Sequence, residues 1–393
     1  MRLGVVTSHP IQYQAPLFRA LAERVDLHVY FAHRATADNQ VEAGFGAGFD
    51  WDTDLTSGFP HTFLDNVAAN PSITRFGGCD TPDVGRALAG DRIDALITYG
   101  WHFKCYLQAG RAAKRLGVPV IARTDSYLDA QRSVLKRLAK ALGYPFVLRW
   151  FDGFLATGTR AVEFLRHYSI PAGRIFVVPY CVDNEFFATG ATAARRDRDR
   201  IRAEHGAASD EFVVLFVGKL IERKRLDVLL EALSLLTKRG LKLRLFIVGT
   251  GDLEQAVRRH ASQSSVPTTF IGFVNQSGLA AIYAAADLLV LPSQIETWGL
   301  VVNEAFACGL PAVLSDRIGC APDMIQENLT GRIVPVGDHQ ALANAIQEFS
   351  GRAHDSMVRD ALAAMTARYS PSCSAEAIIA AATVVLGRRG LDR

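Results

Sequence analysis

The feature that most constrains this chain is the alternation of short apolar runs with stretches whose apolar residues have helical spacing. In the first half, the apolar runs lie at residues 3–6, 27–31, 95–98, 118–122 and 153–156. Between the first two runs, Leu17 and Leu21 lie one helical turn apart. The runs are apolar on both faces, as the buried strands of parallel sheets are. This order predicts a doubly wound α/β sheet whose ligands bind at the carboxyl ends of its strands.

A second series of the same kind fills the other half of the chain. Its predicted strands lie at residues 212–217, 243–248, 269–271, 288–291, 311–314 and 332–334, with helices at about 225–239 and after Asp252. The charged stretch ATGATAARRDRDRIRAEHG between the two series is interpreted as a solvated linker that leads into a helix, in preference to a binding patch. Since 393 residues exceed what one core usually supports, we predict one domain over residues 1–187 and a second over 188–370.

The composition fits a globular enzyme. Apolar residues make up 49% of the chain and charged residues 21%, and a net charge of +3 is too small for a dedicated nucleic-acid binder. The six cysteines form no C-x-x-C pair, which argues against a zinc site or a disulfide framework and favours reduced thiols. The first apolar run is too short for a signal peptide, and the apolar stretches at 280–291 and 377–386 fall short of a membrane span. These features predict a cytoplasmic protein.

The segment PSQIETWGLVVNEAFACGLPAV, residues 292–313, joins a strand end, a loop and an amphipathic helix. The helix is predicted to start near residues 297–299, where its unpaired N–H groups would face an anion such as a diphosphate. Glu296 stands just before those amides, and Glu304 lies about 7.5 Å along the helix from Gly299 at ~1.5 Å per residue. One ligand can therefore span both carboxylates, with one accepting hydrogen bonds from sugar hydroxyls and the other from a ribose diol.

Glu296 and Glu304 reproduce the E-x7-E motif of glycosyltransferase family 4, and the segments ACGLP, SDRIGCAPDMI and NLTGRIVPVGD resemble the sequence that follows this motif in the family. The resemblance implies the GT-B fold, in which two Rossmann-like domains face each other across a cleft. It also implies a retaining transferase with a nucleotide diphosphate sugar as donor, and it places Thr297, Trp298 and Gly299 beside that donor. Taken singly, Glu304 also fits a carboxylate on a helix surface and Glu296 a partner of the helix dipole.

Basic residues follow the strand predicted at 212–217, in the segment FVGKLIERKRLDVLLEAL. By resemblance, Lys219 and Lys224 are the two cations that clamp the donor diphosphate and neutralise its charge as it leaves. The family more often has Arg at the first position, so Lys219 offers a point charge in place of a bidentate fork. Arg223 or Arg225 is a candidate substitute, although solvated cations at a helix start are the simpler interpretation.

Two further segments resemble the donor side of the family. In IVGTGDLEQ, Gly249 and Gly251 would let the backbone approach the ligand. Phe273, in FIGFVNQSG, would lie beside the nucleotide base, with a place in the hydrophobic core as an equal alternative. All three are predicted donor-binding positions.

The first half carries the predicted acceptor side. His9 and Tyr13, in TSHPIQY, lie on the first strand-to-helix loop and are predicted to border the cleft, where His9 contacts donor or acceptor unless its role is structural. In PVIARTDSY, Asp125 stands where the family often has His near the reacting sugar. Asp125 is therefore predicted to be catalytic together with Glu296 and Lys224, with helix capping as its alternative role.

Three other patterns carry less weight. Asp52, Thr53 and Asp54 spell the D-x-D metal motif of another transferase architecture, but without the matching strand they are interpreted as a turn. The histidines lack metal-ligand spacing, and lysines and helix amides suffice for the diphosphate, so we expect no metal and no cofactor. Residues 132–150 mix basic and apolar side chains, which fits a packed helix with a basic face or, alternatively, peripheral contact with an anionic membrane.

The combined prediction is transfer of a hexose-type sugar from a UDP- or GDP-sugar to a hydroxyl of a glycan, lipid-linked or small-molecule acceptor. The alternatives are a nucleotide-sugar epimerase or a phosphorylase of the same architecture, and a nucleotide-sugar-binding protein without catalysis. No nucleic-acid partner is expected, and the inner face of the membrane is the alternative location. By resemblance, the C-terminal helix, at about residues 371–393, packs back on the first domain.

Overall fold

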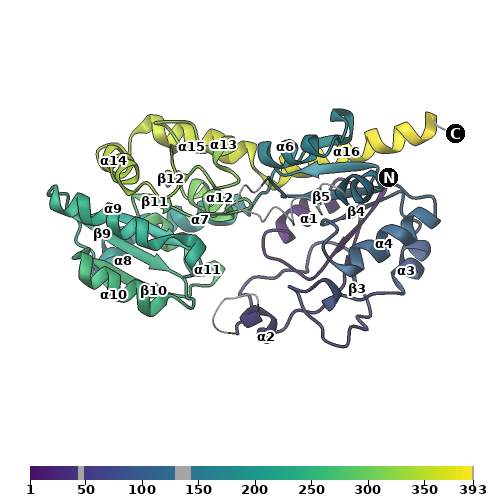
Figure 1. Cartoon of the computed structure of the whole chain (residues 1–393), viewed down its shortest axis with the longest axis horizontal. Coiled ribbons are helices and arrows are strands. Elements are labelled where there is room, and N and C mark those ends of the chain that lie inside the picture. Colours follow the sequence, from purple (N-terminus) through teal and green to yellow (C-terminus); the bar gives the residue numbers. More distant parts are fainter. Residues whose placement is uncertain (43–47, 129–142, 392–393) are drawn as a thin grey trace. The chain divides into compact units, whose positions relative to one another are not determined.

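The computed structural model describes residues 1–42, 48–128 and 143–391, and the chain divides into two compact units (Figure 1). Unit 1 comprises Met1–Ala43, Asp54–Cys181 and Pro371–Arg393, and unit 2 comprises Gly44–Thr53 and Val182–Ser370. The predicted domain boundary lay after residue 187. Unit 2 starts earlier because Asp183 caps helix α7 (Asn184–Ala194) by accepting a hydrogen bond from the Phe186 amide at 3.0 Å, and α7 packs on helices of unit 2.

Unit 1 is built on a seven-stranded sheet with the order β3-β2-β1-β4-β5-β6-β7, in which all paired strands are parallel. The strands are β1 (Arg2–Thr7), β2 (Asp26–Phe31), β3 (His61–Phe63), β4 (Ala95–Thr98), β5 (Val120–Thr124), β6 (Gly153–Ala156) and β7 (Ile175–Val177). Sequence patterns located the central strands but missed β3. This edge strand has three residues, two of them exposed, and therefore no apolar run.

Helices cover both faces of this sheet, as a doubly wound fold requires. They are α1 (Ala15–Ala22), α2 (Ala37–Gln40), α3 (Val84–Asp91), α4 (Lys104–Arg115), α6 (Thr159–His167) and α16 (Pro371–Leu391). The C-terminal helix α16 packs against α1 and β6. Its buried residues Ile378 and Ala382 lie in the same core cluster as Leu17 and Phe18.

Unit 2 has a six-stranded sheet with the order β10-β9-β8-β11-β12-β13, again parallel throughout. Its strands are β8 (Phe212–Val217), β9 (Leu243–Val248), β10 (Thr268–Gly272), β11 (Leu288–Leu291), β12 (Ala312–Ser315) and β13 (Gly331–Val334). Its helices are α7, α8 (Arg198–Glu204), α9 (Leu226–Lys238), α10 (Glu254–Ser264), α11 (Gln276–Ala285), α12 (Leu300–Ala307), α13 (Ala321–Met324), α14 (His339–Ser350) and α15 (Ser356–Arg368).

One helical segment, Ser356–Arg388, has the length and apolar composition of a membrane span. The sequence expectation judged the apolar stretches 280–291 and 377–386 separately and found each too short, and the second of them lies inside this segment. The segment spans two helices, of which α15 belongs to unit 2 and α16 to unit 1. Val358 and Leu362 of α15 and Ile378 and Ala382 of α16 are buried. Core helices of globular domains meet the same criteria, so the composition is weak evidence for a span.

The charged stretch after residue 187 is helical for most of its length, so the linker part of its interpretation is wrong, while the helix into which it was expected to lead is present as α8. It forms the end of α7 and then α8, whose Arg202 is only 2% exposed. Arg202 and Arg198 each donate to the carboxylate of Asp287 at 2.5 Å, and the Val213 amide donates to it at 2.7 Å. The sequence could not reveal this arrangement because the carboxylate lies more than eighty residues away from the two arginines.

The Asp287 cluster predicts a strong effect on stability. Burial alone would raise the pKa of Asp287, but the hydrogen bond from His354 and the charge of Arg202 hold that pKa at about 2. We expect Asp287→Asn to lower the free energy of unfolding by about 3–5 kcal/mol, the usual cost of leaving a buried charge unpaired. The folded-state pKa lies below the unfolded value of about 3.9, so this contribution is present above about pH 4 and is lost as the pH falls toward 2.

The measurement is chemical denaturation of the wild type and variant at pH 7 and at pH 3. The matched control is Asp210→Asn, which breaks the exposed ion pair with Lys242 and should leave the denaturation midpoint nearly unchanged. Equal effects of the two substitutions at pH 7 would contradict a structural role for the buried cluster.

Candidate functional site

The loops at the carboxyl ends of β8 and β11 carry the predicted donor residues of unit 2. The strand order reverses between these two strands, since β9 and β10 lie on one side and β12 and β13 on the other. Such a switch point opens a crevice in which doubly wound sheets bind their ligands. Lys219 and Lys224 follow β8, and Glu296 follows β11. A backbone hydrogen bond of 2.7 Å, from the Gln294 amide to the Arg223 carbonyl, ties the two loops together.

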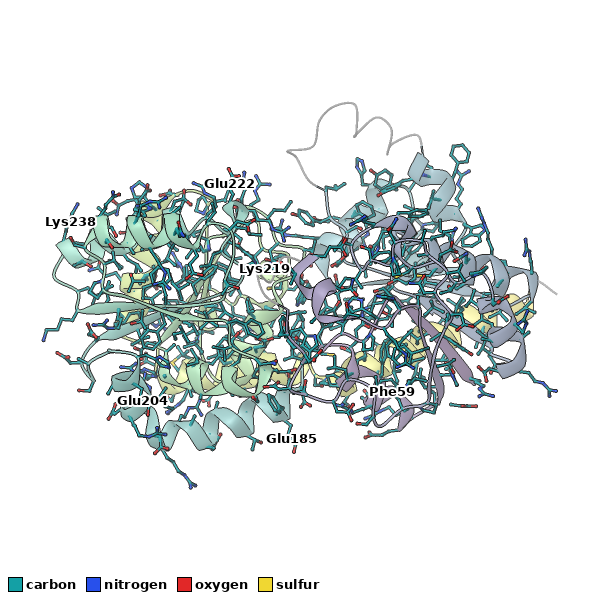
Figure 2. All side chains as sticks on the ribbon, turned by 90° about the horizontal axis from the view of Figure 1, so that it is seen from below. Phe59, Glu185, Glu204, Lys219, Glu222 and Lys238 are labelled. Carbon is teal, nitrogen blue, oxygen red and sulfur yellow. The ribbon has the colours of Figure 1, made fainter. Side chains whose placement is uncertain are left out.

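An ion pair between Lys224 and Glu296 lies in this crevice. Lys224 is 9% exposed, and its Nζ donates to Glu296 Oε2. Lys219, labelled in Figure 2, is half-buried beside the same charges. Burial lowers the pKa of Lys219, and the neighbouring Arg223 and Lys224 lower it further. The ligand-free crevice thus concentrates positive charge that an anionic ligand would stabilise.

The loop after β11 is held by the loop after β12. The Glu296 amide donates to the Arg317 carbonyl at 3.3 Å, and the Gly319 amide donates to the Glu296 carbonyl at 2.9 Å. Helix α12 begins at Leu300, one residue after the range expected from the sequence, because Gly299 adopts φ 101° and forms its N-cap. The Glu296 backbone is therefore fixed independently of any ligand.

Thr297 and Trp298, both predicted beside the donor, differ in their surroundings. Thr297 is exposed. Trp298 is only 3% exposed, donates from Nε1 to Asn303 Oδ1 at 2.9 Å and packs near Tyr369, with 6.1 Å between ring centroids. In this structure the Trp298 side chain belongs to the core of unit 2, so it supports the loop from beneath.

Glu304 lies on α12 and is 4% exposed, so its interpretation as a carboxylate on the helix surface is wrong. Tyr283 of α11 donates from its hydroxyl to Glu304 Oε2 at 2.7 Å. Burial raises the pKa of Glu304 to about 7, although the Tyr283 hydrogen bond opposes this shift. Sequence reasoning missed Tyr283, which sits in an alanine-rich helix without any distinguishing pattern.

The raised pKa of Glu304 predicts that this residue destabilises the free protein at high pH. The folded-state pKa of about 7 exceeds the unfolded value of about 4.3, so the stability associated with this group is lost as the pH rises through 7. We expect Glu304→Gln to unfold like the wild type at pH 4 but to be more stable at pH 8, by about 3 kcal/mol. Denaturation at both pH values measures the difference. The exposed Glu185 (Figure 2), replaced by Gln, is the control and should show no such gain.

The two predicted donor glycines have a structural reason to be glycine. Gly249 has φ +122°, and a Cβ there would lie 2.1 Å from the Gly218 carbonyl oxygen. A Cβ on Gly251 would lie 2.6 Å from the Leu220 carbonyl oxygen. The loop after β9 thus packs backbone to backbone against the loop after β8, and a hydrogen bond of 2.9 Å from the Leu220 amide to the Thr250 carbonyl joins them. This contact holds the loop that leads to Lys219 and Lys224.

We expect Gly249→Ala to destabilise unit 2 by about 2 kcal/mol or more, because both the backbone angle and the overlap with Gly218 disfavour a side chain. Thermal unfolding without ligand measures this cost. Gly351→Ala is the matched control, since a Cβ on Gly351 meets nothing within 4 Å and its φ is −99°. Unchanged unfolding of the Gly249 variant would instead indicate that the glycine serves only ligand approach.

Phe273 follows β10 and is 36% exposed, which contradicts its alternative place in the hydrophobic core. Its ring packs against Phe49, with 4.3 Å between centroids. Beside it, Asn275 Nδ2 donates to the Asp50 carbonyl at 2.8 Å. Residues 48–53 therefore lie along the loop between β10 and α11 within unit 2.

The D-x-D sequence has ordinary roles in the described structure. Asp52 accepts a hydrogen bond from the Ser277 amide at 3.2 Å, near the start of α11. Asp54 accepts from the amides of Thr56 and Ser57 at 2.9 and 3.0 Å, which is a turn of the kind expected from the sequence. Within residues 1–42, 48–128 and 143–391, no group of three His, Cys, Asp or Glu side chains could hold a metal ion.

The predicted residues of the first half share one pocket inside unit 1, with a volume of about 420 Å³. His9, Tyr13 and Asp125 all line it. Tyr180 donates from its hydroxyl to Asp125 Oδ2 at 3.4 Å, and the rings of Tyr13 and Tyr180 lie edge to face at 5.2 Å. Burial lowers the pKa of His9 to about 4, so its imidazole is neutral at pH 7. Residues 126–128, directly after Asp125, are not helical, so its alternative role as the cap of a helix that starts there is wrong.

The same pocket contains a charged residue that the sequence prediction overlooked. Arg123 of β5 is 2% exposed and lines the pocket. Its guanidinium carbon lies 4.9 Å from the Tyr180 ring centroid and 5.6 Å from that of Tyr99. The sequence did contain a signal, because an arginine inside an apolar strand run is unusual and calls for a specific partner.

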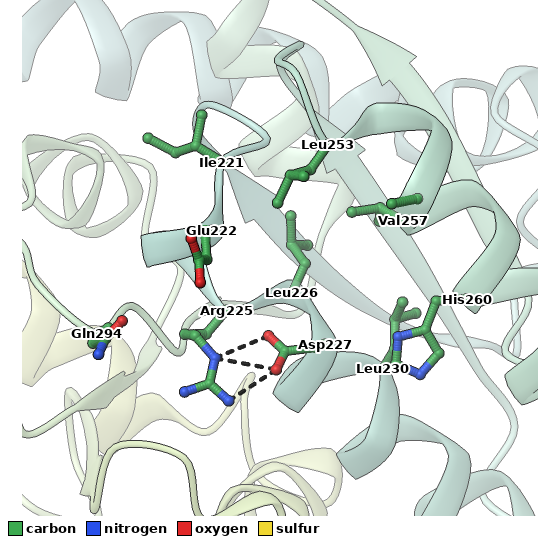
Figure 3. Close-up of a pocket in the computed structure, with 11 residues that line it drawn as sticks. Ile221, Glu222, Arg225, Leu226, Asp227, Leu230, Leu253, Val257, His260 and Gln294 are labelled. Atoms are coloured by element: carbon green, nitrogen blue, oxygen red, sulfur yellow. Dashed lines mark hydrogen bonds and ion pairs between the residues drawn. The ribbon is translucent and has the colours of Figure 1, made fainter.

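Another pocket of unit 2, of about 410 Å³, is lined by the loop after β8 and by helices α9 and α10 (Figure 3). Leu226, Leu253 and Val257 form an apolar part of its wall. Arg225 donates to both carboxylate oxygens of Asp227 there, so its charge is already balanced. Neither Lys219, Lys224, Glu296 nor Glu304 lines this pocket, so it is separate from the predicted donor site.

Most of the basic segment predicted at 132–150 lies outside the described residues. Arg149 and Trp150 are described, and Trp150 packs inward near Phe151, with 5.6 Å between ring centroids. Arg149 is exposed. These two residues fit a helix end with a packed face and a basic face.

Two family descriptions match this chain, one in each unit. "Glycosyl transferase 4-like domain" matches residues 10–181 and "Glycosyl transferases group 1" matches residues 197–356. The chain belongs to the glycosyltransferases of family 4 type that these two descriptions cover. The recognition of family 4 from the E-x7-E motif is thereby confirmed.

Curated relatives of this glycosyltransferase family include a D-inositol 3-phosphate glycosyltransferase from Streptomyces scabiei, which is 30% identical over 61% of this chain and 56% of the relative. A protein of the same name from Rhodococcus erythropolis is 29% identical over 75% of this chain and 71% of the relative. Two other relatives of this name are covered over 50% and 60% of their length, so this chain spans about half to three fifths of most of these relatives.

Solved structures show the fold. A glycosyltransferase from Rickettsia africae matches with a TM-score of 0.73 at 14% identity, covering 98% of both chains. HepE from Anabaena in complex with UDP-glucose matches with a TM-score of 0.70 at 17% identity, covering 96% of this chain and 98% of HepE. The predicted GT-B class, with two Rossmann-like parallel-sheet units, is confirmed.

Proposed function

We propose that this family member is a retaining glycosyltransferase that moves a hexose-type sugar from a nucleotide diphosphate donor to an acceptor hydroxyl. The observation that carries the proposal is the Lys224–Glu296 ion pair, with Lys219 beside it, at the switch point of the unit 2 sheet. A diphosphate that enters this crevice would take over the charge of Lys224 that Glu296 balances in the free protein. The donor would thus bind by exchange of one anionic partner for another.

The proposed roles follow from the chemistry of the leaving group. Lys219 and Lys224 neutralise the negative charge that grows on the diphosphate as the glycosidic bond breaks. Glu296, once released from Lys224, can accept hydrogen bonds from sugar hydroxyls. Glu304 is proposed to bind the ribose diol as a carboxylate, so donor affinity should rise with pH near its pKa of about 7. Asp125 is proposed to contact the reacting sugar from unit 1.

The donor and acceptor classes draw support from the similar proteins. HepE from Anabaena has been solved with UDP and with UDP-glucose, which supports a UDP-sugar, while a GDP-sugar remains the alternative donor. The relatives named D-inositol 3-phosphate glycosyltransferase support a small-molecule acceptor, beside the glycan and lipid-linked acceptors proposed from the sequence. Retention at the anomeric carbon belongs to the same proposal and rests on the family resemblance. Independence from metals and cofactors is also proposed, because the histidines lack metal-ligand spacing and the lysines and helix amides suffice for the diphosphate. A cytoplasmic location, with the inner face of the membrane as the alternative, is proposed from the sequence patterns.

A nucleotide-sugar epimerase, a phosphorylase or a binding protein without catalysis remain the alternatives. Each would keep the donor crevice of unit 2 but would differ in product. Incubation of the protein with a nucleotide sugar, with and without acceptor, distinguishes the transferase from the epimerase and from the binding protein. A transferase releases the nucleotide diphosphate in an acceptor-dependent way, an epimerase changes the sugar without releasing it, and a binding protein does neither.

The first test is a thermal-shift screen against UDP-, GDP-, ADP- and dTDP-sugars. One of them is expected to raise the melting temperature, since a ligand at about 100 times its dissociation constant stabilises the native state by about 2.7 kcal/mol. Glu296→Ala and Lys224→Ala should lose that shift. The control is Lys238→Ala, an exposed lysine on α9 (Figure 2), which should keep it. A shift that survives in both site variants would disprove the proposed donor site.

A further inference from the structure

We infer that the unit 1 pocket binds an acceptor that carries an anionic group, a phosphate or a carboxylate, on a polyhydroxylated body, and that Arg123 selects for this charge. The inference rests on the proposed function and names the chemistry of its acceptor. It is carried by the burial and bonding of Arg123 together with the composition of the pocket wall.

Arg123 brings a full positive charge into the interior of unit 1 with few partners. It is 2% exposed, and Nη2 donates to the Pro179 carbonyl at 3.1 Å. Nε and Nη1 are buried and have no hydrogen-bond partner in the described part of the chain. No ion pair between Arg123 and a carboxylate occurs among the described residues either. Buried charges are normally paired, so this guanidinium lacks the anion that its environment requires.

The other titratable groups of the pocket do not supply that anion. Burial lowers the pKa values of His9 and His102, so both are neutral at pH 7. Burial raises the pKa values of Tyr13, Tyr99 and Tyr180, so their hydroxyls stay protonated.

Asp125 is the one carboxylate in the described wall of this pocket, and it faces a different partner. It accepts the hydrogen bond from Tyr180 at 3.4 Å. The pocket therefore has two ends of opposite character. A carboxylate suits the hydroxyl groups of a ligand, and a buried cation suits an anionic substituent on the same ligand. Because the protein interior screens charge weakly, Arg123 influences the pocket even where a ligand does not touch its nitrogens.

Aromatic side chains complete the wall and fit the body of such a ligand. Tyr99, Trp101 and Tyr180 line the pocket beside Arg123. Their ring faces offer apolar contact to the C–H groups of a sugar or cyclitol, and two of the rings also hold the guanidinium. The chemistry is shared by a free sugar or cyclitol phosphate, a uronic acid and a phosphorylated lipid headgroup.

Calorimetry on the full chain, with UDP at saturation to occupy the donor crevice, tests this inference. The probes are myo-inositol and D-myo-inositol 3-phosphate, and glucose with glucose 6-phosphate and glucuronate. We expect the anionic member of each set to bind at least about tenfold more tightly, because the buried guanidinium attracts its charge through a weakly screening interior. Co-sedimentation with phosphatidylcholine vesicles, with and without phosphatidylinositol, identifies a lipid source if vesicles bind while the free phosphates do not.

The variants are Arg123→Met, Arg123→Lys and, as an exposed arginine of the same unit, Arg86→Met. Arg123→Met should lose the preference for charged probes, Arg123→Lys should keep part of it, and Arg86→Met should keep all of it. The Nη2 hydrogen bond to the Pro179 carbonyl is lost in Arg123→Met, so the melting temperature of every variant is measured beside its binding. A merely structural arginine would lower the melting temperature when replaced but would leave the preference for charged probes unchanged.

Two outcomes overturn the inference. One is equal binding of neutral and anionic probes by the wild type, and the other is failure of every anionic probe, free or in vesicles, to bind. Binding of UDP is measured in a separate titration of the same proteins. If UDP binds and the charge preference is absent, this inference fails while the proposed transferase function stands, whereas loss of UDP binding points to the donor site instead.

Discussion

The buried carboxylate of Asp287 sets the geometry on which the donor side depends. Asp287 immediately precedes β11, accepts the Val213 amide through its side chain at 2.7 Å and donates its own amide to the Val213 carbonyl at 2.9 Å. These two bonds fix the register of β11 against β8 at the amino ends of both strands. Because parallel strands of fixed register end together, the loops that carry Lys224 and Glu296 meet at the opposite edge. A charge cluster outside the site therefore positions the site.

The glycine contacts lie at the carboxyl ends of β8 and β9, where they join the loops that follow these two strands. Gly249 packs on Gly218, and Gly251 packs on Leu220, at distances that leave no room for a side chain. The sequence analysis assigned these glycines to close approach of the backbone to the ligand, and a second interpretation is close packing of one backbone on another. The structure shows the second. The two interpretations are compatible, because a backbone packed this closely also leaves the amides of the β8 loop in a fixed position.

Much of the fold was predictable because its strands are buried on both faces and so produce continuous apolar runs. The bounds of β4, β6, β8, β9 and β11 agree with the runs read from the sequence. What was missed depends on contacts between distant residues. Arg202 reads as a solvated linker charge until Asp287 is placed beside it, and Tyr283, which donates to the predicted donor residue Glu304, gave no signal in the sequence. Arg123 was the exception, since its position inside an apolar strand was visible in the sequence and went unused.

In both units, buried or half-buried positive charge is only partly compensated by carboxylates among the described residues. In unit 2, burial and then the charges of Arg223 and Lys224 lower the pKa of Lys219, and Glu296 offsets only part of this shift. In unit 1, Arg123 is buried without a carboxylate partner among the described residues, in a pocket whose histidines are neutral at pH 7. Uncompensated positive charge costs stability unless a ligand supplies the anion. A nucleotide diphosphate suits the first site, and an anionic acceptor suits the second. Each ligand would then bind more tightly, because its negative charge relieves an unfavourable electrostatic energy that is present in the folded chain without it.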